Sequence, residues 1–183
     1  MKGKKWRGKV YDRNSKDFYE LKEGKGFIKE CSNNRELIFE GEYLNGHKLK
    51  GKEYFFSYSS STNELIFEGE YLYNHRVKGK RYINGKLEYE GEYLFDKKCN
   101  GKGYNKDNNI IYELNKGKGK VREYYDNGII KFEGEYLNFK KIGKGKEYNK
   151  DGSILFEGEY LSKANNRKGK LYYEKGKYYE GEI

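Results

Sequence analysis

The sequence is organised by one short motif, Phe-Glu-Gly-Glu-Tyr-Leu, which first appears in full at residues 39–44. Close copies occupy residues 67–72, 89–94, 132–137 and 156–161, and a shorter copy occupies residues 179–182. Six copies in a chain of 183 residues are the signature of a repeat architecture. We therefore predict a single repeat domain over residues 1–183, with incomplete repeats near 1–20 and 171–183 that act as caps.

A second motif, Gly-Lys, follows the first along the chain. Its glycine comes ten residues after Gly41 and Gly69, and it comes eleven residues after Gly158. Gly-Lys segments of this kind start at Gly8, Gly24, Gly51, Gly79, Gly101, Gly117, Gly143 and Gly169. We therefore expect about eight structural repeats.

Each unit has the pattern of a β-hairpin. In residues 156–160 a period of two places the aromatic residues and the glycine on one face and the two glutamates on the other. Residues 149–152, Asn-Lys-Asp-Gly, have the composition of a turn between two strands, and residues 126–128 and 84–85 are expected to form equivalent turns. Proline is absent, as suits a sheet whose backbone N–H groups are needed for the ladder.

The composition predicts a thin core made largely of aromatic rings. Hydrophobic residues make up only 34% of the chain, but aromatic residues make up 17%. Glycine inside a strand weakens it, so the repeated glycines need a reason. We expect each glycine to leave space that a Tyr or Phe ring of the neighbouring strand fills. On the other face, the motif glutamates are expected to pair across strands with the Gly-Lys lysines.

These residues resemble the MORN repeat, in which an aromatic-Glu-Gly-Glu-aromatic segment is followed by Gly-Lys-Gly. The resemblance covers nearly the whole chain, and residues 132–149 match best. The second aromatic is Tyr here, where the family often has Trp. The resemblance implies an all-β fold, an elongated single-layer antiparallel sheet of about eight stacked β-hairpins forming a MORN-type solenoid. It also implies roles in membrane association, in cytoskeletal or organelle scaffolding and in dimerisation.

The formal net charge of +10 favours contact with an anionic partner. Stacked Gly-Lys strands would align their lysines in a stripe that binds phospholipid head groups or, with lower priority, single-stranded nucleic acid. Alternatively, neighbouring glutamates neutralise this stripe and leave a solvated face of mixed charge. The stripe would comprise Lys52, Lys80, Lys102, Lys118, Lys120, Lys144, Lys146 and Lys170. An aromatic interaction face is expected at Tyr43, Tyr71, Tyr93, Tyr136 and Tyr160.

Other motifs point to no chemistry. Residues 3–9 and 46–52 match Gly-x4-Gly-Lys, but neither match continues with the Ser or Thr and the helix that a phosphate-binding loop requires. His47 and His75 occupy equivalent positions in adjacent units, roughly 10 Å apart at two strand spacings, which is too far for a shared zinc ion. The glutamates recur in every unit, so no pair has the distinct environments that acid-base catalysis requires.

We therefore expect a non-enzymatic scaffold or protein-interaction module that needs no cofactor and no metal. Its partner would be another protein or a second copy of itself, because a single-layer sheet leaves edge strands at both ends and these favour end-to-end or face-to-face dimerisation. Peripheral binding to an anionic membrane surface is the alternative, and nucleic-acid binding is disfavoured.

The cysteines and the lack of a long apolar run bear on localisation. Cys31 and Cys99 lie in different repeats, and no apolar run approaches the roughly 18 residues of a membrane span. We therefore predict a cytoplasmic protein, with or without attachment to a membrane surface.

Overall fold

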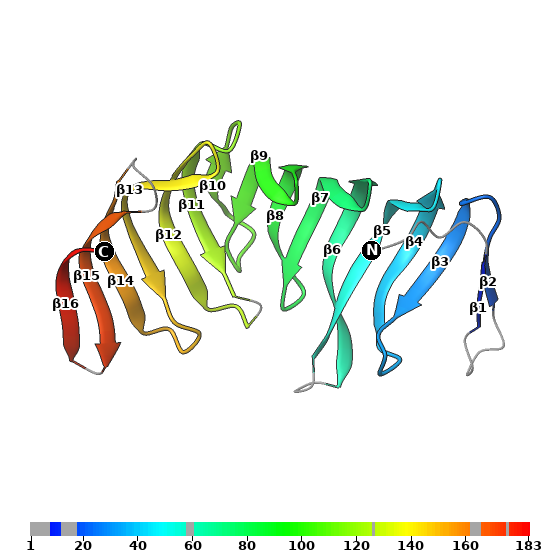
Figure 1. The fold of residues 1–183 in the computed structure, drawn as a ribbon, viewed down its shortest axis with the longest axis horizontal. Coiled ribbons are helices and arrows are strands. Elements are labelled where there is room, and N and C mark those ends of the chain that lie inside the picture. The colour runs from blue at the N-terminus through cyan, green and yellow to red at the C-terminus, as the bar shows by residue number, and fades with distance from the viewer. Residues whose placement is uncertain (1–7, 12–17, 58–60, 126, 162–165, 175) are drawn as a thin grey trace. The chain divides into compact units, whose positions relative to one another are not determined.

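The computed structural model describes residues 8–11, 18–57, 61–125, 127–161, 166–174 and 176–183, and all of its regular elements are β-strands. The described residues contain no helix (Figure 1). The strands are β1 Gly8–Tyr11, β2 Phe18–Leu21, β3 Gly26–Cys31, β4 Leu37–Leu44, β5 His47–Ser57, β6 Thr62–Leu72, β7 His75–Ile83, β8 Lys86–Leu94, β9 Lys97–Tyr104, β10 Ile110–Leu114, β11 Gly119–Tyr124, β12 Ile130–Leu137, β13 Lys140–Tyr148, β14 Ile154–Tyr160, β15 Arg167–Glu174 and β16 Lys177–Glu182.

Within each sheet the strands follow one another in the order in which they occur in the sequence. β1 and β2 form a pair, β3 to β10 form an eight-stranded sheet, and β11 to β16 form a six-stranded sheet. Every strand pair with a described register is antiparallel. The predicted all-β fold of consecutive stacked hairpins is confirmed.

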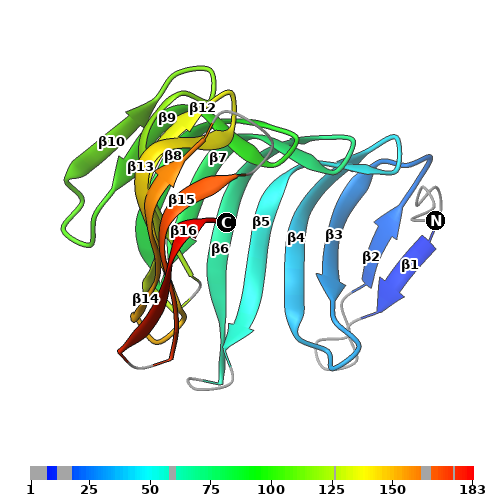
Figure 2. The ribbon, with the colours of Figure 1, turned by 60° about the vertical axis from the view of Figure 1, so that its left-hand side comes forward.

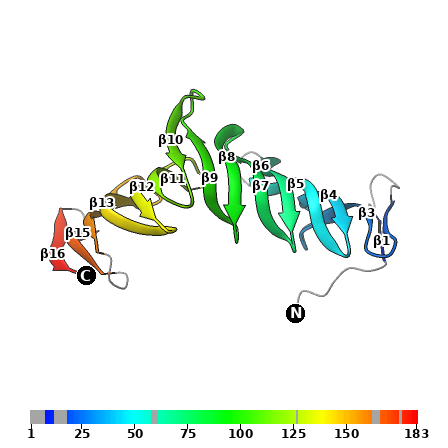
Figure 3. The ribbon, with the colours of Figure 1, turned by 90° about the horizontal axis from the view of Figure 1, so that it is seen from above.

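The chain divides into two compact units. Unit 1 comprises residues Met1–Gly85 and Glu92–Asp96, and unit 2 comprises Lys86–Gly91 and Lys97–Ile183. In unit 1, β3 to β7 lie side by side (Figures 2 and 3). In unit 2, β11 to β16 are arranged in the same way.

The buried side of each unit is made of aromatic rings. Ten of the fourteen buried apolar side chains among the described residues are Phe or Tyr, which confirms the predicted ring-based core. In unit 1 the rings of Phe39, Tyr71, Phe67 and Tyr93 contact one another edge to face, with centroids 5.4–5.7 Å apart. Such contacts add about 0.5–1.5 kcal/mol each beyond the area that they bury.

Cross-strand glycine pairs make room for these rings. Gly41 lies opposite Gly51, and Gly158 lies opposite Gly169. A Cβ atom at Gly51 would lie 2.6 Å from Cζ of Phe39, and one at Gly158 would lie 2.8 Å from Cζ of Phe156. At Gly51 the ring belongs to the neighbouring strand, as expected, whereas Gly158 accommodates the ring of Phe156 in its own strand, so the expectation holds only in part.

Turns with positive φ connect the strands where the sequence predicts them. Asn84 and Gly85 have φ of 50° and 72°, as in the mirror-image turns that suit hairpins. Gly152 has a φ of 87°, and its N–H donates to the carbonyl of Asn149 over 3.0 Å. In the turn predicted at 126–128, the N–H of Gly128 donates to Tyr125, while residue 126 lies outside the described residues.

Bulges interrupt the pairing near the motif tyrosines. Glu42 lies opposite Lys50, but the next residue, Tyr43, lies opposite Lys48, so one residue of β5 is skipped. The same shift places Arg76 opposite Tyr71. A bulge moves the following side chains to the other face of the sheet. Lys48 and Arg76 therefore lie on the aromatic face.

Candidate interaction surface

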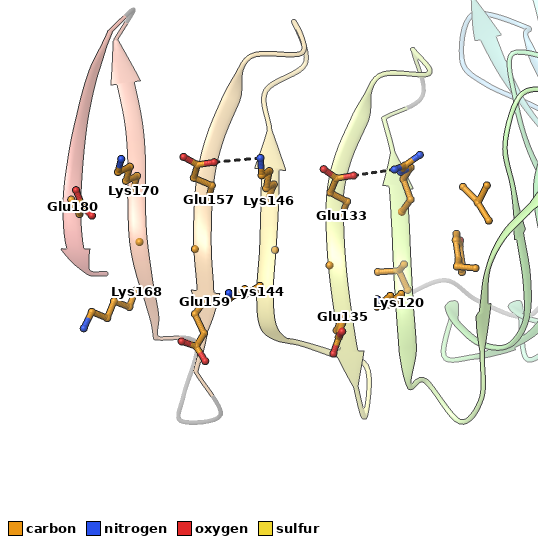
Figure 4. Close-up of a pocket in the computed structure, with 18 residues that line it drawn as sticks. Lys120, Glu133, Glu135, Lys144, Lys146, Glu157, Glu159, Lys168, Lys170 and Glu180 are labelled. Carbon is orange, nitrogen blue, oxygen red and sulfur yellow. Dashed lines mark hydrogen bonds and ion pairs between the residues drawn. The ribbon is translucent and has the colours of Figure 1, made fainter.

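One face of the unit 2 sheet carries charged side chains on every strand, and we call it the charged face. Its strands alternate in sign, because β11, β13 and β15 contribute cations and β12, β14 and β16 contribute carboxylates (Figure 4). The side chains line a groove with a volume of about 1000 Å³. They are Lys120, Arg122, Glu133, Glu135, Lys144, Lys146, Glu157, Glu159, Lys168, Lys170 and Glu180.

The strand register fixes this alternation. Lys146 lies opposite Glu133 on one side and Glu157 on the other, and Lys170 lies between Glu157 and Glu180. The Nζ atom of Lys146 is 3.4 Å from a carboxylate oxygen of Glu157 (Figure 4). The predicted cross-strand ladder of lysine and glutamate is therefore present, and each exposed pair contributes only a few tenths of a kcal/mol.

Tyrosines border the charged face and hold its carboxylates. The hydroxyl of Tyr148 donates to Glu133 over 2.6 Å, and that of Tyr172 donates to Glu157 over 2.8 Å. Burial and the bond to Glu133 raise the pKa of Tyr148 to about 12. The hydrogen bond from Tyr172, helped by Lys146, lowers the pKa of Glu157. The sequence-based reasoning did not single out these tyrosines, although each comes two residues after a Gly-Lys lysine.

The charges of the groove nearly cancel. Six cations and five carboxylates line it, and each cationic strand lies beside at least one acidic strand. Opposite charges one strand spacing apart, about 4.8 Å, cancel at distances beyond a Debye length of about 8 Å. This surface therefore has a fine pattern of alternating charge and only a weak net positive field.

The charged face of unit 1 follows the same rules. Lys52 lies between Glu40 and Glu68, and Lys80 lies opposite Glu68. The hydroxyl of Tyr54 donates to Glu40 over 2.6 Å.

The eight lysines of the predicted stripe lie on several strands and do not form one uninterrupted basic surface. Lys52 and Lys80 belong to unit 1 and the other six to unit 2. Lys118 lies in the turn before β11 and bridges to Asn115, and Lys102 is 3.6 Å from Glu113. The structure brings Lys120, Lys144, Lys146 and Lys170 together in the groove, where glutamate strands separate them.

The five tyrosines of the predicted aromatic interaction face belong to the core. Tyr43, Tyr71, Tyr93 and Tyr160 are 4–8% exposed, and Tyr136 is half-buried. Tyr136 stacks on Phe132 with the ring centroids 5.7 Å apart. Their rings are thus covered by their own sheet.

Five cations cover the core rings from the aromatic face, and the sequence-based reasoning missed them. Lys48 Nζ lies 3.9 Å from the ring centroid of Phe39, and the guanidinium of Arg76 lies 4.5 Å from that of Phe67. Lys98, Lys141 and Arg167 lie in the same way over Tyr89, Phe132 and Phe156. Each of these cations is ion-paired with a glutamate: Glu30, Glu53, Glu88, Glu147 and Glu147, respectively.

The two histidines begin strands β5 and β7 and contact the next turn of unit 1. The ring of His47 lies edge to face with that of Tyr73, with centroids 5.6 Å apart, and His75 faces Phe95 at 6.4 Å. His75 Nδ1 is also 2.6 Å from a carboxylate oxygen of Asp96. Within the described residues, no group of three or more His, Cys, Asp or Glu side chains is arranged to hold a metal ion. The histidines thus serve as links between neighbouring turns.

The two Gly-x4-Gly-Lys matches have different outcomes. Gly46 lies in a turn with a φ of 75°, and strand β5 follows it where a phosphate-binding loop would be followed by a helix. The other match includes residues 3–7, which lie outside the described residues.

The functional conclusion rests on the sequence and on the geometry of the chain. No protein-family model matches the chain, and no curated protein sequence matches it. Across the part of the chain that the structure describes, no helix has the length and apolar character that crossing a membrane requires.

Proposed function

We propose that this chain is a non-enzymatic repeat scaffold, similar to MORN-repeat proteins, that binds protein partners through its charged face. The observation that carries the proposal is the alternation of charge from strand to strand in the unit 2 groove. A protein surface carries charges of both signs at spacings of several ångströms, so it can match such a pattern, and the pattern then selects partner and register.

The stiffness of the charged face supports this role. Its carboxylates are held by cross-strand lysines and by tyrosine hydroxyls, and the glycine pairs keep the strands in register. A preorganised surface loses little conformational entropy on binding.

The alternative proposal is peripheral binding to an anionic membrane surface through the same lysines, in a cytoplasmic protein. The net charge of +10 favours it, but the groove has six cations and five carboxylates. An anionic lipid surface would meet about as many repulsive as attractive charges there, so we rank this function second and nucleic-acid binding below it.

A charge-reversed variant tests the first proposal. Changing the six groove cations to Glu, and the five groove carboxylates together with Glu182 to Lys, keeps the cross-strand charge pairs of these strands opposite in sign, so the fold should persist. Partners captured from an extract by the wild-type chain, and cross-linked to groove lysines, should be lost by the variant. Equal capture by both chains, with circular dichroism showing both folded, would contradict binding through the charged face.

Co-sedimentation with vesicles separates the alternative. The scaffold proposal predicts no sedimentation with anionic vesicles at physiological salt, and at most a weak interaction at low salt. Retention on anionic but not neutral vesicles at physiological salt, abolished by Lys144→Gln and Lys146→Gln, would make the lysines a membrane site instead.

A further inference from the structure

Strand β16 carries a copy of the repeat motif whose core positions are exposed. Tyr179 and Ile183 occupy the positions that Phe156 and Tyr160 occupy in β14. Tyr179 is 52% exposed and Ile183 38%, whereas Phe156 is 0% and Tyr160 8% exposed. The motif is the same, so the difference must come from what covers it.

In the earlier copies a Gly-Lys strand covers the motif ring from the following side. Phe156 lies opposite Leu171 of β15, and the guanidinium of Arg167, also on β15, covers its ring 4.4 Å from the centroid. β16 is the last strand of its sheet and pairs with β15. A Cβ atom at Gly181 would lie 2.6 Å from the hydroxyl of Tyr179, so the ring already has its usual position over the motif glycine.

The other repeats indicate which residues a strand paired with the second side of β16 would need. It is an extended strand with glycine opposite Gly181 and lysine opposite Glu180. In β15 these positions are Gly169 and Lys170, which lie opposite Gly158 and Glu157. An apolar residue follows, since Leu171 lies opposite Phe156.

Strand β1 has this sequence. Its residues Gly8, Lys9 and Val10 repeat the order glycine, lysine, apolar residue. Within the strands that the structure describes, β1 pairs only with β2. The other Gly-Lys strand at a sheet end, β11, is different, because the backbone carbonyl of Glu113 lies against Gly119, 2.5 Å from where its Cβ would be.

Unit 2 contains a complete template for joining these strands. In β9 and β10, Gly101 lies opposite Leu114 and Lys102 opposite Glu113. β1 and β2 have the same register, with Gly8 opposite Leu21 and Lys9 opposite Glu20.

The template also includes the strand on the other side of β9. That strand is β8, whose motif is Tyr89-Glu90-Gly91, and a Cβ at Gly91 would lie 2.7 Å from Cα of Gly101. Tyr89 is 0% exposed in this arrangement. β16 has the same residues, Tyr179-Glu180-Gly181, and among the strands that the structure describes it pairs with β15.

We propose that β16 of one copy pairs with β1 of a second copy of this chain, in the antiparallel register that β14 and β15 use. Gly8 then lies opposite Gly181, Lys9 opposite Glu180 and Val10 opposite Tyr179. The junction buries the exposed ring and continues the sheet from one copy into the next. Because it joins two different surfaces, it does not close on itself as a two-fold dimer does, and copies add end to end. This gives the scaffold function a means of extension.

Sedimentation velocity over a wide range of concentrations tests the junction. The wild-type chain should form species whose masses are successive multiples of 21.8 kDa, growing with concentration. Gly8→Val places a branched side chain opposite Gly181, and Glu180→Lys places two lysines opposite each other, so each variant should remain monomeric. Glu159→Lys makes the same change of charge on the interior strand β14 and should assemble like the wild type.

Mixing the two blocked variants gives a sharper result. Gly8→Val keeps a functional β16 and Glu180→Lys keeps a functional β1, so an equimolar mixture should form a dimer and stop there. If Gly8→Val loosens β1 itself, the charge-reversed pair provides a second readout: Lys9→Glu alone blocks assembly, and Lys9→Glu with Glu180→Lys restores it.

Three outcomes would overturn the junction: a wild-type chain that is monomeric at every concentration, one that stops at a dimer, or blocked variants that assemble like the wild type. None of these outcomes bears on capture of other proteins by the charged face. The junction and the proposed function therefore fail separately.

Discussion

The ring of Phe39 on β4 occupies the space that a side chain at Gly51 on β5 would need. An added Cβ would lie 2.6 Å from Cζ of the ring and 2.4 Å from the carbonyl oxygen of Glu40. We predict that Gly51→Ala lowers the free energy of unfolding by at least about 2 kcal/mol, because both the ring and the neighbouring backbone must move. Denaturant titration measures this. Gly85→Asn is the control, since nothing lies within 4 Å of that position and Asn tolerates its positive φ.

Removing the aromatic ring at the same motif position of two strands should lower the free energy of unfolding by different amounts. Phe156→Ala removes a ring that is 0% exposed and should cost about 3–5 kcal/mol. Tyr179→Ala removes a ring that is 52% exposed and should cost less than about 1.5 kcal/mol in the monomer, measured by thermal unfolding at low concentration. Similar losses at both positions would mean that β16 is covered in the isolated chain.

The cations that cover the core rings should contribute more to the free energy of unfolding than the cations of the charged face. Arg76 covers Phe67 and pairs with Glu53, and both charged side chains are about one-fifth exposed. Arg76→Met should cost about 1–3 kcal/mol, because it leaves Glu53 without its partner. The double variant Arg76→Met, Glu53→Gln should recover part of the loss. A double-mutant cycle with no coupling would argue against the pair.

Lys146 provides the contrasting case. Its side chain is 45% exposed, and its pair with Glu157 is bordered by solvent. Lys146→Gln should change the free energy of unfolding by less than about 0.5 kcal/mol. A loss as large as that of Arg76→Met would show that the charged face holds the sheet together, which would weaken the case for a recognition role.

Stability should depend on the ionisation of Glu147. Burial by itself raises the pKa of this carboxyl, but hydrogen bonds and charge from Lys141 and Arg167 outweigh burial and lower it. A carboxyl with a depressed folded-state pKa stabilises the fold above its unfolded pKa of about 4.3, and this contribution is lost as the pH falls through the folded-state value. The Glu147→Gln variant should therefore lose less stability than the wild-type chain as the pH falls from about 5 to the acid limit. Urea titration at each pH measures this loss. The turn variant Gly85→Asn, which changes no ionisable group, should retain the wild-type slope.

The alternation of residues in the motif was sufficient to predict the two faces of the sheet. Phe156 and Gly158 lie on the aromatic face, and Glu157 points into the charged groove, as a period of two requires. The same period could not place Lys48. The bulge at Leu49 shifts Lys48 to the aromatic face, and a bulge depends on local backbone geometry that leaves no periodic mark in the sequence.

The candidate surface was predictable only in part. The sequence places lysines opposite glutamates, but whether that pairing leaves a net basic stripe depends on how many strands of each sign lie together. Lys144 has glutamate strands on both sides, so the predicted stripe is divided. Tyr43 was assigned to an interaction face, but it is 6% exposed, and its ring lies edge to face with that of Phe39 in the core.

The turns between strands lie along two edges of the sheet, one at each end of the strands, and the two sets of turns differ. At the edge that follows the motif, two-residue turns such as Asn45-Gly46 are joined to the neighbouring turn by backbone hydrogen bonds, as Gly46 is to Gly24. At the opposite edge, nothing lies within 4 Å of a Cβ atom added at Gly85, in the two-residue turn between β7 and β8. Evolutionary insertions, and epitope tags added by an experimenter, should therefore be accepted within Asn84-Gly85 and rejected within Asn45-Gly46, where they would break the hydrogen bond to Gly24.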